Sequence, residues 1–148
     1  MKLFIEQSEW EQEPEIHIKC KTIDEKLQRI IDQLQLMTLT VTGKNGGAIH
    51  KLSFEDIYYF ESVDDKVFAC CEVEVYETTH KLYEIEKMMA ENSFARISKS
   101  VILNINKIQS IRPQFNGRFE AMLLNGERQI VNRHYVSGLR DKFMGGVK

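Results

Sequence analysis

The chain has 148 residues, of which 43% are apolar and 28% are charged, so it is long enough for one domain with a real core and too apolar for a disordered segment. Its three cysteines, two of them adjacent at Cys70 and Cys71, do not form the even set of a disulfide framework, which indicates a reducing compartment. The sequence has no apolar run long enough to cross a bilayer and no basic, apolar leader, so we expect a cytoplasmic protein.

The formal net charge of −2 hides a strong asymmetry along the chain. Residues 1–91 contain ten Lys or Arg and nineteen Asp or Glu, a net charge of −9, whereas residues 92–148 contain ten Lys or Arg and three acids, a net charge of +7. A basic C-terminal third suggests a polyanion such as nucleic acid as its partner.

The first 37 residues predict a small β-β-α segment. Residues 3–5 and 16–20 have the composition of short strands, separated by an acidic connection that contains Pro14. Thr22 and Glu25 have the spacing of a capping box, and apolar residues then recur at helical spacing. We therefore expect a helix over 23–36, with Thr22 as its cap and an apolar stripe of Leu27, Ile30, Ile31 and Leu34.

The sequence predicts a boundary between two parts of the chain near residue 38. Residues 39–42 and 48–52 flank a Gly-rich turn, which is typical of a β-hairpin. We expect residues 1–37 to serve association or regulation and residues 38–148 to form the main domain, so that a chain beginning at Met37 is expected to fold.

Within the main domain, short apolar runs predict strands at 57–60, 66–70 and 73–76, with a turn over 62–65 and a helix over 80–90. Residues 100–132 predict an antiparallel meander whose last hairpin turns at Asn125-Gly126. The stretch from Phe94 to Ile108 combines apolar anchors for a buried strand with a polar, basic cluster at Arg96, Ser98, Lys99, Ser100 and Lys107.

Catalytic and metal-binding patterns are not evident in the sequence. The four histidines share no metal-ligand spacing with the cysteines, and Cys70-Cys71 lies in a predicted strand, where a buried structural thiol is the favoured interpretation. We expect no enzyme activity, no cofactor and no metal.

The cluster Asn132-Arg133-His134-Tyr135 follows the last predicted strand. Arg133 has the forked geometry that bridges two acceptors on a guanine edge or holds a phosphate. The spacing alone slightly favours the other interpretation, a solvated strand end with Tyr135 packed inward.

Several motifs together resemble the LytTR family of bacterial DNA-binding domains. They are Ile57-Tyr58-Tyr59-Phe60-Glu61-Ser62, the helix from Leu82 to Met89, Phe94-x-Arg96-Ile97-Ser98-Lys99-Ser100-x-Ile102-Leu103-Asn104, Ile108, Asn125-Gly126 and Arg133-x-Tyr135. The resemblance covers roughly residues 38–144. The commoner family form has His-Arg in place of Ser98-Lys99 and Ser-Arg in place of Asn132-Arg133. The Ile-Ser-Lys-Ser form is similar to stand-alone regulators that have a short N-terminal segment instead of a receiver domain.

The resemblance implies an α+β, β-dominated fold of small antiparallel sheets that reads duplex DNA with loops. Transferred by position, the family's contacts fall on Lys66, Ser98, Lys99 and Arg133, while Arg96 is assigned to pairing with an acidic neighbour as readily as to DNA. The full set of expected DNA-binding residues is Lys66, Ser98, Lys99, Lys107, Arg118, Arg133 and His134.

The expected function is a transcriptional regulator that binds promoter sites as a homodimer, with a membrane protein as a possible regulatory partner. The alternative is a protein-interaction module that controls a membrane or signalling partner through its acidic N-terminal part.

Overall fold

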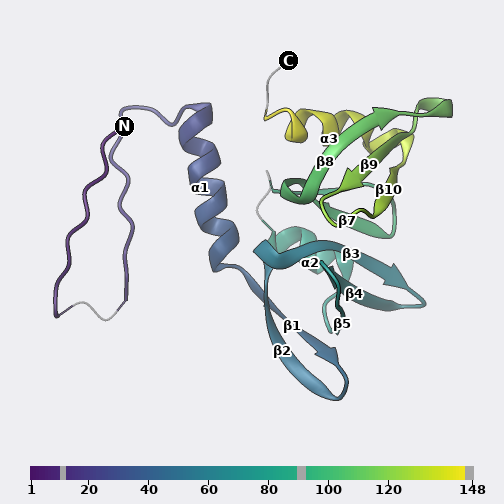
Figure 1. The fold of residues 1–148 in the computed structure, drawn as a ribbon, viewed down its shortest axis with the longest axis horizontal. Coiled ribbons are helices and arrows are strands. Elements are labelled where there is room, and N and C mark those ends of the chain that lie inside the picture. The colour runs from purple at the N-terminus through teal and green to yellow at the C-terminus, as the bar shows by residue number, and fades with distance from the viewer. Residues whose placement is uncertain (11–12, 90–92, 146–148) are drawn as a thin grey trace.

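A computed structural model describes residues 1–10, 13–89 and 93–145 of the chain (Figure 1). Strands dominate it, and the helices are few and short, which confirms the expected α+β class. The elements in chain order are α1 (Glu25–Thr38), β1 (Thr40–Asn45), β2 (Ala48–Ser53), η1 (Phe54–Asp56), β3 (Ile57–Val63), β4 (Lys66–Cys71), β5 (Val75–Thr78), α2 (Leu82–Met88), β6 (Phe94–Arg96), β7 (Val101–Asn104), η2 (Ile105–Lys107), β8 (Ile108–Pro113), η3 (Phe115–Gly117), β9 (Phe119–Leu123), β10 (Arg128–Val131), η4 (Arg133–Tyr135) and α3 (Val136–Phe143).

The strands form two antiparallel sheets. The larger has seven strands in the order β2-β1-β5-β4-β3-β7-β6, and the smaller has three in the order β10-β9-β8. The predicted hairpins β1–β2 and β9–β10 are confirmed, and their turns contain Gly46 and Gly126 with φ of 60° and 91°. Such positive φ angles favour glycine, because it has no β-carbon.

Strand β7 lies between two hydrophobic cores. Val101 and Leu103 belong to the core shared with the smaller sheet and α3, whereas Ile102 belongs to the core that contains Phe54, Phe60 and α2. Successive side chains of a strand point to opposite faces, so the continuous apolar run of β7 is buried on both sides. The loop before β7 is therefore fixed from two directions.

The predicted meander over residues 100–132 is wrong in its first strand. β8, β9 and β10 form the meander, but β7 pairs with β3 and β6 in the larger sheet, and η2 separates β7 from β8. The cause is the apolar run of β7, whose four residues are all buried and need cover on both faces, whereas β8 and β10 of the meander leave most of their residues exposed or half-buried. The helix α3, which the sequence pattern did not reveal, closes the smaller sheet's core through Leu139.

Helix α1 begins at Glu25, and its cap is Asp24 instead of the expected Thr22. The Asp24 carboxylate accepts a hydrogen bond from the backbone N–H of Leu27 at 2.8 Å, which satisfies one of the free N–H groups of the first turn. The predicted apolar stripe of α1 is only half-buried, while Leu36 is 1% exposed in the core of the larger sheet. The domain boundary proposed near residue 38 therefore passes through a helix that is docked on the main domain.

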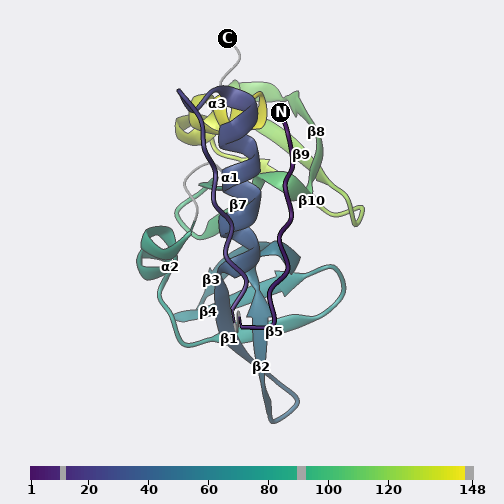
Figure 2. The same ribbon diagram turned by 90° about the vertical axis from the view of Figure 1, so that its left-hand side faces the viewer.

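The two strands expected before α1 are wrong. Residues 3–5 and 16–20 are extended, but the described part of the chain before α1 contains no strand. The segment lies to the left of α1 and apart from the sheets in Figure 1, and it runs in front of them in Figure 2. Leu3 and Phe4 are 85% and 86% exposed. A two-stranded hairpin is at best marginally stable without a third strand or a helix against its apolar face, and here the chain offers neither.

None of the helices in the described residues is both long and apolar enough to span a membrane.

We predict that Asn104→Ala destabilises the protein. Asn104 is 0% exposed; its Nδ2 donates to the carbonyl of Ile57 at 2.8 Å and its Oδ1 accepts from the N–H of Asn106 at 3.0 Å. Removal of this amide leaves a buried carbonyl without its partner, so the free energy of unfolding should fall by about 2–3 kcal/mol. Urea unfolding measures the loss. The exposed neighbour Asn106→Ala serves as the control and should change stability by less than about 0.5 kcal/mol; equal midpoints for the two variants would contradict the prediction.

Candidate nucleic-acid interface

Three segments that are distant in sequence meet where β7 begins. The N–H of Ser62, near the end of β3, donates to the carbonyl of Ser100 at 2.8 Å. The N–H of Asn132, after β10, donates to the carbonyl of Ile97 at 2.9 Å. The β3–β4 turn, the Ile97–Ser100 loop and the residues after β10 therefore form one continuous edge, which we call the loop edge.

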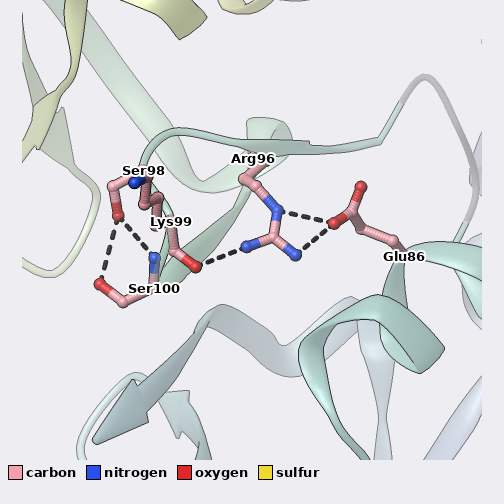
Figure 3. A network of polar contacts seen from close by, with 5 residues as sticks. All are labelled: Glu86, Arg96, Ser98, Lys99 and Ser100. Atoms are coloured by element: carbon pink, nitrogen blue, oxygen red, sulfur yellow. Dashed lines mark hydrogen bonds and ion pairs between the residues drawn. The ribbon is translucent and has the colours of Figure 1, made fainter.

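The Ile97–Ser100 loop is held by its own polar groups (Figure 3). The Ser98 hydroxyl accepts from the N–H of Ser100 at 3.2 Å and lies 3.3 Å from the Ser100 hydroxyl. The N–H of Ile97 donates to the carbonyl of Val101 at 3.0 Å and closes the loop at its base. Ser98 is half-buried and Lys99 is exposed, so the loop presents the lysine from a fixed backbone.

Arg96 clamps this loop to α2, as expected of a structural arginine. Its Nε donates to Glu86 Oε1 at 2.6 Å, and its Nη1 donates to the carbonyl of Lys99 at 2.6 Å (Figure 3). A second guanidinium nitrogen also contacts Glu86 in an ion pair. Because both ends of the guanidinium are engaged, Arg96 positions Lys99 and is not itself available to a ligand.

Arg133 lies on the same edge, over the β8–β9 connection. A β-carbon added to Gly117 would lie 2.9 Å from Cδ of Arg133, so the arginine stem lies directly on the glycine backbone. Gly117 has φ of 74°, a second reason for glycine here. Arg118 follows immediately and is exposed, which places two arginines side by side.

The surroundings of two other expected residues, Lys66 and His134, differ from each other. Lys66 lies at the β3–β4 turn on the loop edge, but its Nζ is 3.6 Å from Glu77 Oε1, and Asp64 and Asp65 form the turn beside it. His134 is exposed next to Arg133 in the single turn η4.

Lys107 lies away from the rest of the set. It follows the opposite end of β7, where its Nζ is 5.2 Å from the centre of the Tyr58 ring. The contacts described above link the segments that carry Lys66, Ser98, Lys99, Arg118, Arg133 and His134, whereas Lys107 lies at the opposite end of β7.

The cations of the edge differ in whether they are already paired. Within residues 1–10, 13–89 and 93–145, the charged groups of Lys99, Arg118 and Arg133 have no ion pair or hydrogen bond. Arg112 and Arg128 instead both contact the Glu120 carboxylate, at 3.0 and 3.5 Å. The unpaired cations give the edge a positive field.

The two adjacent thiols lack the features of nucleophiles. Burial raises the pKa of the Cys70 thiol to about 12 and that of Cys71 to about 11, so both are protonated near neutral pH. Cys70 lies in the core between the sheets, as expected of a structural thiol.

Two positioning residues, Glu86 and Gly117, were not singled out from the sequence. Glu86 lies on a helix whose apolar stripe indicates core packing and says nothing about its polar face. Its partner Arg96 is ten residues away, so the sequence does not pair them. Gly117 gave a signal, because Asn116-Gly117 marks a turn, but its contact with Arg133 exists only in the folded chain.

Comparison with known proteins adds independent evidence. The sequence model of the LytTr DNA-binding domain matches residues 47–144. A solved structure, the LytTr DNA-binding domain of a Bacillus cereus protein described as a methyl-accepting/DNA response regulator, superposes with a TM-score of 0.66 at 30% identity over 70% of this chain and 94% of that one.

Among curated relatives, the sensory transduction protein LytT of Enterococcus faecalis is 33% identical over 94 residues, which is 64% of this chain and 39% of that protein. LytT of Bacillus anthracis is 36% identical over 60% of this chain and 36% of its own length. The chain thus spans less than two fifths of these relatives. A Staphylococcus aureus protein described as an uncharacterised HTH-type transcriptional regulator is 26% identical over 96% of both chains.

We predict that Arg96→Ala loosens the Ile97–Ser100 loop. Hydrogen bonds to charged groups contribute about 1.5–3 kcal/mol, so loss of the clamp should speed amide exchange in this loop by at least about tenfold. Hydrogen exchange followed by mass spectrometry measures the change. Lys99→Ala is the matched control, since it removes a side chain of the same loop but keeps the carbonyl that Arg96 contacts; equal exchange in both variants would show that Arg96 does not hold the loop.

Proposed function

Because the chain belongs to the LytTr family of DNA-binding domains, we propose that it is a sequence-specific transcriptional regulator that contacts duplex DNA with the loop edge. The observation that carries the proposal is the cluster of unpaired cations Lys99, Arg118 and Arg133 on a rigid edge. The proposed site of action is the bacterial cytoplasm.

The proposed roles follow from the chemistry of each side chain. Arg133 has a stem supported by Gly117 and a free guanidinium, so it is suited to a bidentate contact with guanine O6 and N7. Lys99 and Arg118 are suited to phosphates, which position the protein on the duplex. The Ser98 hydroxyl accepts from the Ser100 N–H and retains its own proton, which it can donate to a phosphate.

Lys66 and His134 have supporting roles in this proposal. The contact with Glu77 reduces the effective charge of Lys66, although a surface pair at 3.6 Å exchanges easily for a phosphate. His134 extends the edge beyond Arg133. The interface as proposed does not include Lys107, because the opposite end of β7 is remote from Lys99.

The N-terminal segment supports a proposal of dimerisation. Its exposed apolar side chains include Trp10, 89% exposed, and Ile16, 68% exposed, in addition to Leu3, Phe4 and Ile5. Exposed apolar groups of this density mark an association surface. The proposed occupant is the same segment of a second copy, whose extended residues would supply the missing strand partners.

The same observation supports a second candidate function. If residues 1–21, which are acidic and carry these apolar side chains, bind a different protein, such as a membrane-bound regulator, the chain is an interaction module whose DNA contact is controlled by that partner. Sedimentation of the purified chain separates the two, since only self-association produces a dimer without the partner.

We predict a strong salt dependence of binding that changes in a defined way in two variants. With about four phosphates neutralised, the logarithm of the affinity should fall with the logarithm of the salt concentration with a slope of about −4. Lys99→Ala should reduce the slope by about 1 and weaken all sequences alike, whereas Arg133→Ala should cost about 1–3 kcal/mol and relax discrimination at one base pair.

Fluorescence anisotropy with a selected duplex and a scrambled duplex gives both quantities. Lys26→Ala, at an exposed position on α1, is the control and should bind as the wild type does. Wild-type affinity of both test variants for both duplexes would show that the loop edge is not the DNA-binding surface.

We predict that deletion of residues 1–21 keeps the fold and the sequence preference but abolishes dimerisation. This cut preserves Asp24 and Leu36, whereas a chain beginning at Met37 would remove a residue of the core. Analytical ultracentrifugation and a gel-shift titration should show a monomer with reduced affinity. A shortened chain that remains dimeric yet loses DNA binding would overturn the proposed division of roles.

A further inference from the structure

Phe115 presents an aromatic ring to solvent at the tip of the β8–β9 connection. The residue is 92% exposed, and it belongs to the three-residue turn η3. The connection projects beyond the smaller sheet at the upper right of Figure 1. Because the ring stays exposed to water in the folded chain, its apolar surface contributes no burial energy to folding.

The loop that carries Phe115 is closed by hydrogen bonds. The N–H of Gln114 donates to the carbonyl of Arg118 at 2.8 Å, and the N–H of Arg118 donates to the carbonyl of Phe115 at 3.4 Å. Outside the loop, Nε2 of Gln114 donates to Glu120 Oε2 at 2.8 Å. The turn also requires φ of 63° at Asn116, which asparagine tolerates better than most residues. The ring is therefore held out from the surface by a defined turn.

The surroundings of Phe115 are basic. Arg118 is three residues away, and Gly117 lies against the stem of Arg133; Arg112 lines the same open concave surface, but its guanidinium contacts Glu120. Val73, which is 84% exposed, has the opposite setting, because it lies between Glu72 and Glu74. An apolar ring among arginines fits a partner that is anionic overall but has apolar groups within reach.

Duplex DNA meets this description. Phosphates line the groove, and the 5-methyl of thymine is the apolar group on the base edges of the major groove. Because Gly117 lies against the stem of Arg133, the turn that carries Phe115 is next to the arginine that we assign to base contact.

We infer that Phe115 packs against a thymine methyl next to the base pair contacted by Arg133, and so adds sequence selectivity. The inference rests on the proposed function. Phe115 acts by apolar contact and Arg133 by hydrogen bonding, so the two residues select different bases.

Single replacement of each thymine by deoxyuridine tests the contact, because it removes only the methyl group. The probe is the duplex that the full chain selects from a randomised double-stranded pool. One replacement should weaken wild-type binding by about fourfold, the factor expected for one buried methyl-sized group. Phe115→Ala should weaken binding to the unmodified duplex and should be insensitive to that replacement.

Two further variants test whether the deoxyuridine effect depends on an apolar side chain at position 115. Phe115→Leu keeps an apolar side chain and should retain part of the sensitivity to deoxyuridine. Val73→Ala removes an exposed apolar group in an acidic setting and should behave as the wild type. All variants should show the wild-type thermal midpoint, since these side chains are exposed.

The outcomes distinguish the inference from the function on which it rests. If the full chain selects no duplex, both are wrong. If the wild type selects a duplex but no deoxyuridine replacement weakens it, or if the replacement weakens Phe115→Ala equally, the methyl contact alone is overturned. If Phe115→Ala reduces the bending of the DNA and no deoxyuridine replacement has an effect, the ring is inserted between two base pairs. This result would likewise overturn the methyl contact.

Discussion

Burial of β7 on both faces is the constraint on which the arrangement of the loops depends. Val101 and Leu103 fill one core and Ile102 fills the other, so the strand has no freedom to shift toward either sheet. Asn104 fixes its far end by a buried hydrogen bond to Ile57, at the irregularity where β3 meets β4. The Ile97–Ser100 loop leads directly into this strand, so the strand fixes the position of the loop. This explains how polar residues at 97–100 keep a defined geometry at the surface.

Rigidity at the loop edge arises from contacts that cross between elements. Arg96 connects α2 to the carbonyl of Lys99, and the N–H of Asn132 connects the smaller sheet to Ile97. Each of these contacts uses a backbone group of the loop, so the exposed side chain of Lys99 is left for a ligand. A site preorganised in this way loses little conformational entropy on binding, and more of the interaction energy is retained as affinity.

The sequence predicted the fold class and the main hairpins because each depends on local pattern or on a family motif. It left Arg96 open between an acidic neighbour and DNA, because its partner Glu86 is ten residues away and meets it only in the folded chain. The two strands expected before α1 failed because alternation at Ile16 and Ile18 reports strand tendency but not the presence of a partner strand. Thr22 and Asp24 both satisfy the rules for a cap, and only the geometry of the first turn selects Asp24. Lys107 was grouped with Lys99 by charge, but β7 separates the two lysines, since Lys99 precedes the strand and Lys107 follows it.

The attraction of this chain for a polyanion depends more on which cations are unpaired than on the total number of cations. Residues 92–148 have a formal charge of +7, but Arg96 contacts Glu86, and Arg112 and Arg128 share Glu120. Arg140 lies 5.6 Å from the Phe119 ring, and Lys142 donates to the carbonyl of Phe94. Cations engaged in this way stabilise the fold and attract phosphate weakly, because their fields are partly cancelled or their positions are fixed elsewhere. The unpaired positive charge of the described residues at this edge is therefore concentrated at Lys99, Arg118 and Arg133, and this concentration allows a chain of net charge −2 to present a locally basic surface although Asp64 and Asp65 lie at the β3–β4 turn.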